Sequence, residues 1–284
     1  MTMSLSSLQL DAFAAVSRCL SFSRAARELH VTQSALSQRI SNLEEHLGLT
    51  LFVRDRSGVR LTEPGLRLVR YCESKIGLEQ ELLGEIKAGD STEIAGRLRI
   101  AGYSTVVRSL LLPRLADLLR THPNVGLEFE LAEMRDLPGK LLRGESEFIV
   151  LDHRLERAGV EATVIGEEQY VLIESSAYRG RVSVYLDHDS DDTMTERFFK
   201  HQGKAAVPPM VQKRSRSFLD EIYAIIDGVR LGLGRAVVPR HLLGKSAGVR
   251  VVAGYRPLRV PVVLHHFTQP YYSRLSQHAL KALL

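Results

Sequence analysis

The stretch from His30 to Gly48, HVTQSALSQRISNLEEHLG, constrains the fold more than any other part of this 284-residue chain. Four aliphatic side chains recur in it at helical spacing and predict one buried stripe, made of Leu36, Ile40, Leu43 and Leu47. The opposite face carries small polar side chains in place of lysine and glutamate, namely Ser34, Ser37, Gln38 and Ser41. Because serine is a poor helix former and adds little solubility, this face predicts a surface shaped to approach another molecule.

Two shorter helices are expected before this one, over residues 8–20 and 23–29, from the spacing of their apolar side chains. The three-residue connection 30–32 then gives a helix-turn-helix of the usual size. Thr32 is a good N-cap, Gly48 is a good helix end, and His30 stands where the turn needs a positive φ. Short hydroxyl side chains let such a helix approach the floor of a DNA major groove, where serine and glutamine can bond to base edges.

The net charge of the chain does not carry the DNA-binding interpretation. It is +5, but residues 1–90 hold 11 basic and 11 acidic side chains, whereas residues 204–284 hold 13 and 3. Arginines beside the expected third helix and in the hairpin after it supply local attraction to phosphates, which fixes register without reading sequence. The predicted DNA contacts are Ser23, Thr32, Gln33, Ser34, Ser37, Gln38, Arg39, Ser41, Arg54, Arg56 and Arg60.

The segment LFVRDRSGVRL, residues 51–61, predicts a β-hairpin that turns at Gly58 and would form the wing of a winged helix. A plain solvated turn is the alternative for Arg54 and Arg56. Thr62, followed by Glu and Pro, marks the start of a long helix that can run to about residue 87. Three-four spacing along it predicts a self-association seam of Val69, Cys72, Ile76, Leu83 and Ile86. The alternative is a helix packed on its own chain.

From about residue 96 short apolar runs alternate with helical segments, which predicts α/β units with mainly parallel sheets. The length of this region, roughly 190 residues, favours two subdomains over one. The segment SFLDEIYAIIDGVRLG, residues 217–232, is expected to form one long helix.

The stretch SFSRAARELHVTQSALSQRISNLEEHLGLTLFVRDRSGVRLTEPG resembles the DNA-binding domain of the LysR-type transcriptional regulators. It shares the paired Ala25 and Ala26, the VTQSALS entry into the third helix, the LEEHLG helix end and the LTEPG entry into a linker helix. The resemblance implies a multidomain chain. An all-α winged helix-turn-helix (residues 1–62) and a dimerising linker helix (63–89) would precede an α/β effector-binding domain (90–284). That domain would have two lobes, like a periplasmic binding protein, with lobe I near 96–165 and 266–284 and lobe II near 166–265.

In that family a small-molecule effector lies between the two lobes, and the resemblance assigns its contacts position by position. They are Ser104 or Thr105, Ala132, Glu133, Asp152, His153, Asp189 and Phe218. Acidic members of this set would repel the organic anions that most of these regulators take, which favours a cationic or amino-acid effector. The segment LDHDSDDTM is also similar to the matching part of the lysine- and arginine-responsive regulators of arginine export. Asp191 and Asp192 within it are expected to cap a helix start.

The function predicted from these features is sequence-specific DNA-binding transcriptional regulation that a small-molecule effector modulates. The partners implied are double-stranded DNA, an amino acid or other small metabolite, further copies of the chain as a homodimer and homotetramer, and RNA polymerase. The alternative is an effector-independent, architectural DNA-binding protein with a vestigial cleft. The sequence indicates no enzyme, no cofactor and no metal site, because it has no nucleophile elbow, phosphate-binding glycine loop or metal-binding cysteine pair.

The chain has no apolar run near the roughly 18 residues of a membrane span and no signal-peptide pattern, so a cytoplasmic location is expected. Its two cysteines, Cys19 and Cys72, are expected to be core or interface thiols.

Overall fold

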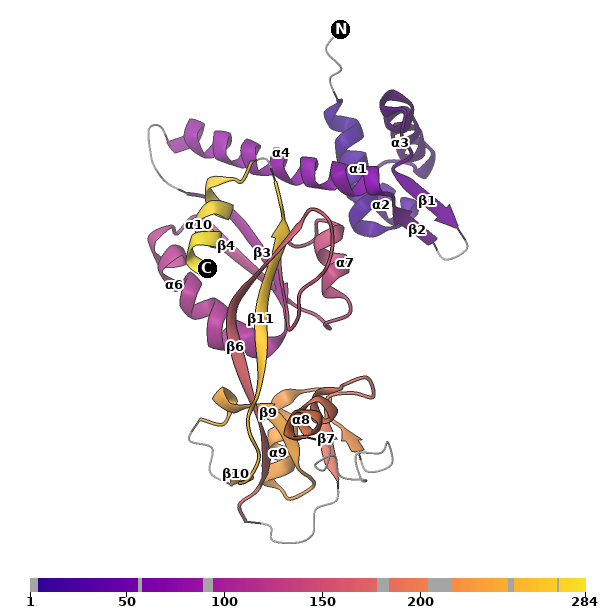
Figure 1. Ribbon diagram of the computed structural model, residues 1–284. Coiled ribbons are helices and arrows are strands. Elements are labelled where there is room, and N and C mark those ends of the chain that lie inside the picture. The colour runs from indigo at the N-terminus through magenta and orange to yellow at the C-terminus, as the bar shows by residue number, and fades with distance from the viewer. Residues whose placement is uncertain are drawn as a thin grey trace. The chain divides into compact units, whose positions relative to one another are not determined.

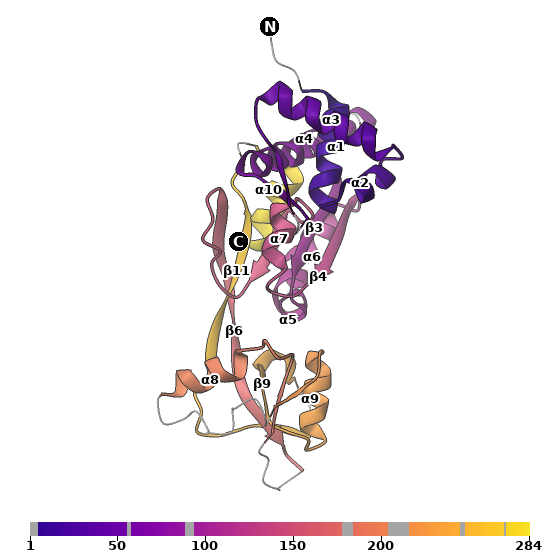
Figure 2. The same cartoon turned by 90° about the vertical axis from the view of Figure 1, so that its right-hand side faces the viewer.

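A computed structural model describes residues 5–55, 58–88, 94–177, 184–203, 216–244, 248–269 and 271–284 of the chain. The chain divides into two compact units, one made of Met1–Thr163 with Val263–Leu284 and the other of Val164–Val262. Figures 1 and 2 show the elements of each unit in two views. Among the described residues, no helix combines the length and apolar character that a membrane crossing requires.

The N-terminal domain consists of three helices and a hairpin, as the sequence predicts. Its elements are α1 (Ser7–Cys19), α2 (Phe22–Glu28), α3 (Gln33–Leu47), β1 (Phe52–Asp55) and β2 (Gly58–Leu61). Leu36, Ile40 and Leu43 are at most 1% exposed, which confirms three of the four members of the expected stripe, whereas Leu47 at the end of the helix is only partly buried. The Phe52 ring of the wing packs 5.3 Å from Phe13, so wing and helices share one core.

Local signals at the ends of α3 also behave as predicted. The Thr32 hydroxyl accepts a hydrogen bond from the amide of Ala35 at 3.2 Å, which is N-capping. Gly48 ends the helix with φ of 64°, and His30 in the turn has φ of 53°. The connection before α3 and the end of the helix therefore both contain residues suited to their backbone conformation.

The linker helix α4 (Glu63–Ala88) begins where the hairpin ends. The Thr62 hydroxyl lies 2.7 Å from the Thr50 carbonyl and accepts from the amide of Gly65, so one side chain joins the wing base to the helix start. Gly65 lies against the carbonyl of Leu51, and a Cβ at this position would approach that oxygen to 2.4 Å. The backbone contact explains why this turn of α4 contains glycine.

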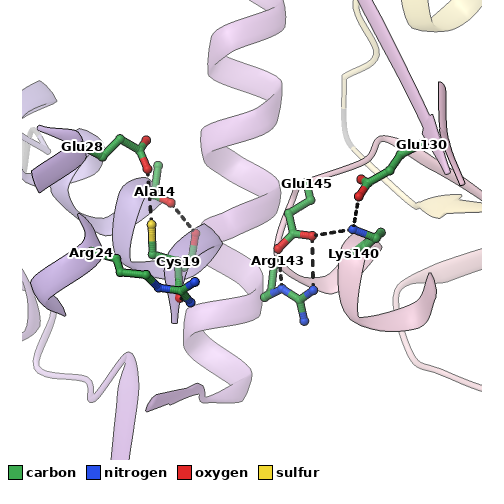
Figure 3. Close-up of polar contacts among 9 residues, drawn as sticks. Ala14, Cys19, Arg24, Glu28, Glu130, Lys140, Arg143 and Glu145 are labelled. Atoms are coloured by element: carbon green, nitrogen blue, oxygen red, sulfur yellow. Dashed lines mark hydrogen bonds and ion pairs between the residues drawn. The ribbon is translucent and has the colours of Figure 1, made fainter. Parts of the chain in front are cut away.

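The rest of the first unit is lobe I, a sheet flanked by helices. The strands β3 (Gly96–Gly102), β4 (Val125–Leu131) and β5 (Phe148–Leu151) are parallel, in the order β5-β3-β4, and β11 (Leu258–Phe267) pairs antiparallel with β5. The helical segments are α5 (Ser104–Val106), the π-helical η1 (Val107–Leu111), α6 (Leu112–Thr121), α7 (Leu137–Leu142) and α10 (Arg274–Leu283). Lys140 of α7 contacts Glu130 of β4 at 2.6 Å and Glu145 at 3.4 Å, which ties the helix to the sheet edge (Figure 3).

The second unit is lobe II. Its strands β9 (Ala236–Pro239) and β10 (Val249–Val251) both pair antiparallel with β6 (Val160–Ser175), and β7 (Tyr185–Asp187) pairs parallel with β8 (Arg216–Phe218). The helices are α8 (Met194–Gln202), the short 3-10 turn η4 (Arg240–Leu242) and α9 (Ile222–Arg230). The expectation of mainly parallel sheets is wrong here, because β6 and β11 each pair antiparallel with their neighbours. The long helix expected over 217–232 is also shorter, since residues 216–218 form a strand instead.

Candidate DNA-binding surface and effector-binding residues

The polar face of α3 is open to solvent at its N-terminal end. Of the seven predicted contacts between residues 32 and 41, five are exposed, namely Thr32, Gln33, Ser34, Gln38 and Ser41, whereas Ser37 and Arg39 are half-buried. The Ser23 hydroxyl of α2 donates to Gln33 Oε1 at 2.9 Å, so the two helices present one hydrogen-bonded edge. This bond uses the amide oxygen of Gln33 as an acceptor, and the NH2 group of the same exposed side chain is a donor of the kind that can bond to a base edge.

The wing carries Arg54 in a fixed position. Its guanidinium carbon lies 3.6 Å from the centroid of the buried Phe22 ring, close enough for a cation–π contact. Arg54 and Arg60 are both exposed on the hairpin. Arg56, the third predicted wing contact, lies outside the described residues. A cation held on an aromatic ring beside the start of α2 suits a phosphate contact.

The predicted seam of α4 is divided between two environments. Val69 and Cys72 belong to the core of the N-terminal domain, and burial raises the pKa of the Cys72 thiol to about 12. Ile76, Leu83 and Ile86 are 41%, 53% and 70% exposed. The first half of the helix thus packs on its own chain, while the second half presents apolar side chains to solvent.

In lobe I the predicted effector contacts follow the ends of three parallel strands. Ser104 and Thr105 come after β3, Ala132 and Glu133 after β4, and Asp152 and His153 after β5. Parallel strands end at the same edge of a sheet, so these residues gather at one wall. The amide of Ala132 donates to the Gly102 carbonyl at 3.1 Å and holds two of the strand ends together.

Side chains at this wall offer polar groups to a ligand. Thr105 is 7% exposed, and its hydroxyl has no hydrogen-bond partner among the described residues. Asp152 Oδ1 lies 2.7 Å from His153 Nδ1, and Glu133 is exposed. A buried hydroxyl without a partner is costly, which makes it a natural ligand contact.

In lobe II the segment around Asp189 is a compact turn. Asp189 Oδ1 accepts from the amides of Asp191 and Asp192 at 2.6 and 2.9 Å, and Asp192 Oδ1 accepts from the amide of Met194 at 2.7 Å. Asp192 therefore bonds to the first amide of α8, as expected, although the N-cap residue itself is Thr193, whose side chain makes no capping bond. Asp189 is half-buried, and its other oxygen, Oδ2, lies 3.8 Å from His188 Nδ1.

Phe218 stands at the end of β8 and is 45% exposed. The neighbouring Arg216 forms a buried ion pair with Asp187 of β7, with Nε and Oδ2 2.6 Å apart and both side chains at most 4% exposed. Burial raises the pKa of Asp187, and the bonds from Thr195 and Arg216 oppose that rise. This pair holds β8 beside β7 and thereby positions Phe218.

Comparison with known proteins decides what these surfaces belong to. Residues 8–66 match the family model of the bacterial regulatory helix-turn-helix proteins of the lysR family, and residues 91–283 match the LysR substrate-binding domain. The chain belongs to the LysR family. It is therefore a transcriptional regulator that binds DNA through the winged helix-turn-helix and a small-molecule effector through its two-lobed domain, and the family consists of regulators, which are not enzymes. Members of the family also form oligomers.

Three relatives illustrate the range of the family. The RuBisCO operon transcriptional regulator of Allochromatium vinosum is 29% identical over 250 residues, which cover 83% of this chain and 80% of that protein. ArgP from Mycobacterium tuberculosis shares the fold with a TM-score of 0.75 and 24% identity, over 99% of this chain and 96% of that one. Full-length LysG from Corynebacterium glutamicum, solved with bound effector arginine, shares the fold with a TM-score of 0.73 and 22% identity, over 98% of this chain and 96% of that one.

Several positioning residues of this LysR-type regulator escape sequence analysis. Glu44 Oε1 accepts from the amides of Leu51 and Phe52 at 2.6 and 3.2 Å and so fixes the start of the wing. Phe22 and Arg216 act through side-chain contacts with Arg54 and Asp187. The only signal in the sequence is that each lies within a few residues of a predicted contact, and this does not reveal the pairing.

Proposed function

We propose that this regulator reads bases through the N-terminal half of α3, takes a cationic amino acid as its effector and works as an oligomer assembled through α4. The observation that carries the effector proposal is the set of strand ends in lobe I: Glu133 follows β4, Asp152 follows β5, and the Thr105 hydroxyl after β3 has no hydrogen-bond partner among the described residues. Carboxylates at such a wall favour a cation. Asp189 adds an acidic side chain from lobe II.

For DNA, the exposed polar side chains of α3 are assigned to bases, and the arginines to phosphates. The bond from Ser23 to Gln33 and the stacking of Arg54 on Phe22 support this division, since each holds a donor in place. The residues assigned are Ser23, Thr32, Gln33, Ser34, Ser37, Gln38, Arg39, Ser41, Arg54, Arg56 and Arg60.

The proposed effector contacts come from both lobes: Ser104, Thr105, Ala132, Glu133, Asp152, His153, Asp189 and Phe218. Phe218 is exposed, and its ring centroid already lies 5.4 Å from the Arg216 guanidinium carbon, so the face away from Arg216 is the one it can offer to a cation. The acidic groups offer acceptors to the N–H groups of the effector. LysG, whose fold this chain shares, was solved with bound arginine. That supports an effector with a guanidinium or ammonium group.

The proposed assembly is a homodimer formed through α4 and paired into a homotetramer. The exposed Ile76, Leu83 and Ile86 support this, because solvated apolar side chains at such spacing gain from a partner helix. The proposed boundaries are 1–62, 63–89 and 90–284. The division at residues 163 and 263 supports the two lobes within the last part. A cytoplasmic location and contact with RNA polymerase complete the proposal.

Calorimetric titration and thermal unfolding of the full chain with L-arginine, L-lysine, L-citrulline and succinate test the effector class. Arginine or lysine should stabilise the fold, by about 2.7 kcal/mol at a hundredfold excess over the dissociation constant. Citrulline has nearly the shape of arginine without its charge and should bind more weakly. Glu133→Gln should weaken arginine binding, whereas Glu156→Gln, at an exposed position of the same lobe, should not.

Tighter binding of succinate than of arginine, or equal binding of citrulline and arginine, would contradict a cationic effector. Stabilisation by none of a wide set of amino acids and organic acids would favour the effector-independent architectural function instead.

A further inference from the structure

A cavity of about 250 Å³ lies where α4 meets lobe I, apart from the predicted effector contacts. In both views α4 runs beside α10, the last helix of the chain (Figures 1 and 2). The side chains that decide its chemistry are Glu73, Arg97, Arg99, Glu147, Gln269 and Ser273. The lining of the cavity therefore comes from two parts of the chain, the helix that follows the DNA-binding domain and the effector-binding domain.

Glu73 of α4 is the unusual member of this lining. Its side chain is 8% exposed, and Oε1 lies 3.5 Å from Arg99 Nη2. The other oxygen, Oε2, is buried and has no hydrogen-bond partner among the described residues. A buried carboxylate oxygen without a donor is costly, so its retention calls for a proton or a ligand that donates to it.

The neighbouring charges do not satisfy Glu73. Arg99 also faces Glu147, with Nε and Oε1 3.7 Å apart, so one guanidinium serves two carboxylates. Arg97 lies 3.4 Å from the exposed Glu128. Burial raises the pKa of Glu73 to about 8, Arg99 opposes this and Glu147 adds to it. At neutral pH the Glu73 carboxyl therefore carries a proton, and a bound cation could replace that proton.

We propose that this cavity binds a small organic ammonium ion, whose N–H groups donate to the Glu73 carboxylate and whose apolar part lies against Ile76 and Leu275. Both apolar side chains line the cavity. On binding, the Glu73 proton passes to solvent and the ammonium ion takes its place. The exchange leaves the charge of the cluster unchanged, which avoids the penalty of adding a net charge to a buried site.

An organic cation fits better than a metal ion. Among the described residues, Glu73 and Glu147 do not belong to a group of three or more His, Cys, Asp or Glu side chains that could share an ion. The cavity also has room for a ligand of several heavy atoms, and Gln269 and Ser273 offer further acceptors. A ligand held here would contact α4 and lobe I together and stabilise their contact.

Titration calorimetry of the full chain with n-butylammonium chloride tests the site. We expect saturable binding that weakens about tenfold or more in Glu73→Gln. Glu79→Gln is the matched control, because Glu79 lies on the same helix, is 55% exposed and already pairs with Lys75. Binding to this variant should equal that of the wild type. Neither n-butanol nor butyrate, which lack the cation, should bind.

The number of protons released gives a second readout that needs no variant. Near neutral pH, wild-type binding should release close to one proton, measured by repeating the titration in two buffers of different ionisation enthalpy. At pH values above the pKa of Glu73, ligand binding should release no proton, because the carboxyl is already ionised. Absent binding, equal binding to Glu73→Gln, or binding without proton release would each overturn the proposal. None of these results would affect the assignment of DNA contacts or of the effector, since neither involves Glu73.

Discussion

Gln33 and Arg54 show how differently two DNA-facing side chains are held. Gln33 is fixed by a hydrogen bond from Ser23, which orients an amide that can pair with a base. Arg54 rests on the Phe22 ring, which places a charge without giving it base-reading geometry. The first arrangement supports specificity and the second supports affinity.

Gln33→Ala and Ser37→Ala should therefore relax sequence preference, each with a loss of about 1–3 kcal/mol on the preferred site and little on unrelated DNA. Arg54→Ala should weaken binding to all sequences alike. The slope of the logarithm of the binding constant against the logarithm of salt concentration should become shallower by about 1, because one phosphate contact is lost. Fluorescence anisotropy with matched and scrambled duplexes at several salt concentrations measures both effects. A uniform loss from Gln33→Ala would show that this amide does not read bases.

Individual residues also show where sequence reasoning succeeds. Thr32, Gly48 and His30 were predictable because their roles depend on the backbone within four residues, and local rules describe such positions. Glu44 was not, because its partners Leu51 and Phe52 lie seven and eight positions away and the intervening turn decides the contact. The role of Glu73 was not predictable for the same reason, since its partner Arg99 lies 26 positions away, beyond the end of α4.

At the scale of elements, apolar periodicity was sufficient to predict the N-terminal helices. It was not sufficient to predict the helices and strands of lobe II. Residues 217 and 218 were predicted to begin a helix, yet they belong to a strand that pairs with β7, beside the ion pair of Arg216 with the buried Asp187. Tertiary contacts of this kind override local preference. The antiparallel pairing of β6 with β9, and of β11 with β5, likewise depends on long-range partners that no local pattern specifies.

The junction between wing and linker helix is tight at Gly65. Gly65→Ala should stabilise the fold by about 1 kcal/mol through higher helix propensity. It should destabilise the fold by more than that, because the new Cβ would lie 2.4 Å from the Leu51 carbonyl oxygen. We expect a net loss of about 1–3 kcal/mol in unfolding free energy, the usual range for overpacking, with weaker DNA binding. Denaturant unfolding followed by circular dichroism measures the first effect.

Gly126→Ala is the control for that change, because the nearest atom to a Cβ there is 3.9 Å away. It should leave DNA binding unchanged. Gly65→Ala with an equal or higher denaturation midpoint would show that the wing can move away from α4 without loss, and the junction would then not be rigid.

For the whole molecule, the decisive property is the surface along the second half of α4. Ile86 is 70% exposed and Leu83 is 53% exposed, so neither is needed for the fold of one chain. Ile76 is less suitable for a test, because it also lines the cavity beside Glu73. A charge at Ile86 should therefore act on assembly alone.

Ile86→Glu should shift the full chain toward monomers or lower-order species in analytical ultracentrifugation, because a buried carboxylate at a helix seam is strongly unfavourable. Its thermal stability at low concentration should stay near that of the dissociated wild type. Arg67→Glu, at a side chain that is 73% exposed on the same helix, controls for added charge and should leave the oligomer intact. An Ile86→Glu chain with wild-type sedimentation would remove α4 from the interface and would require assembly through another surface.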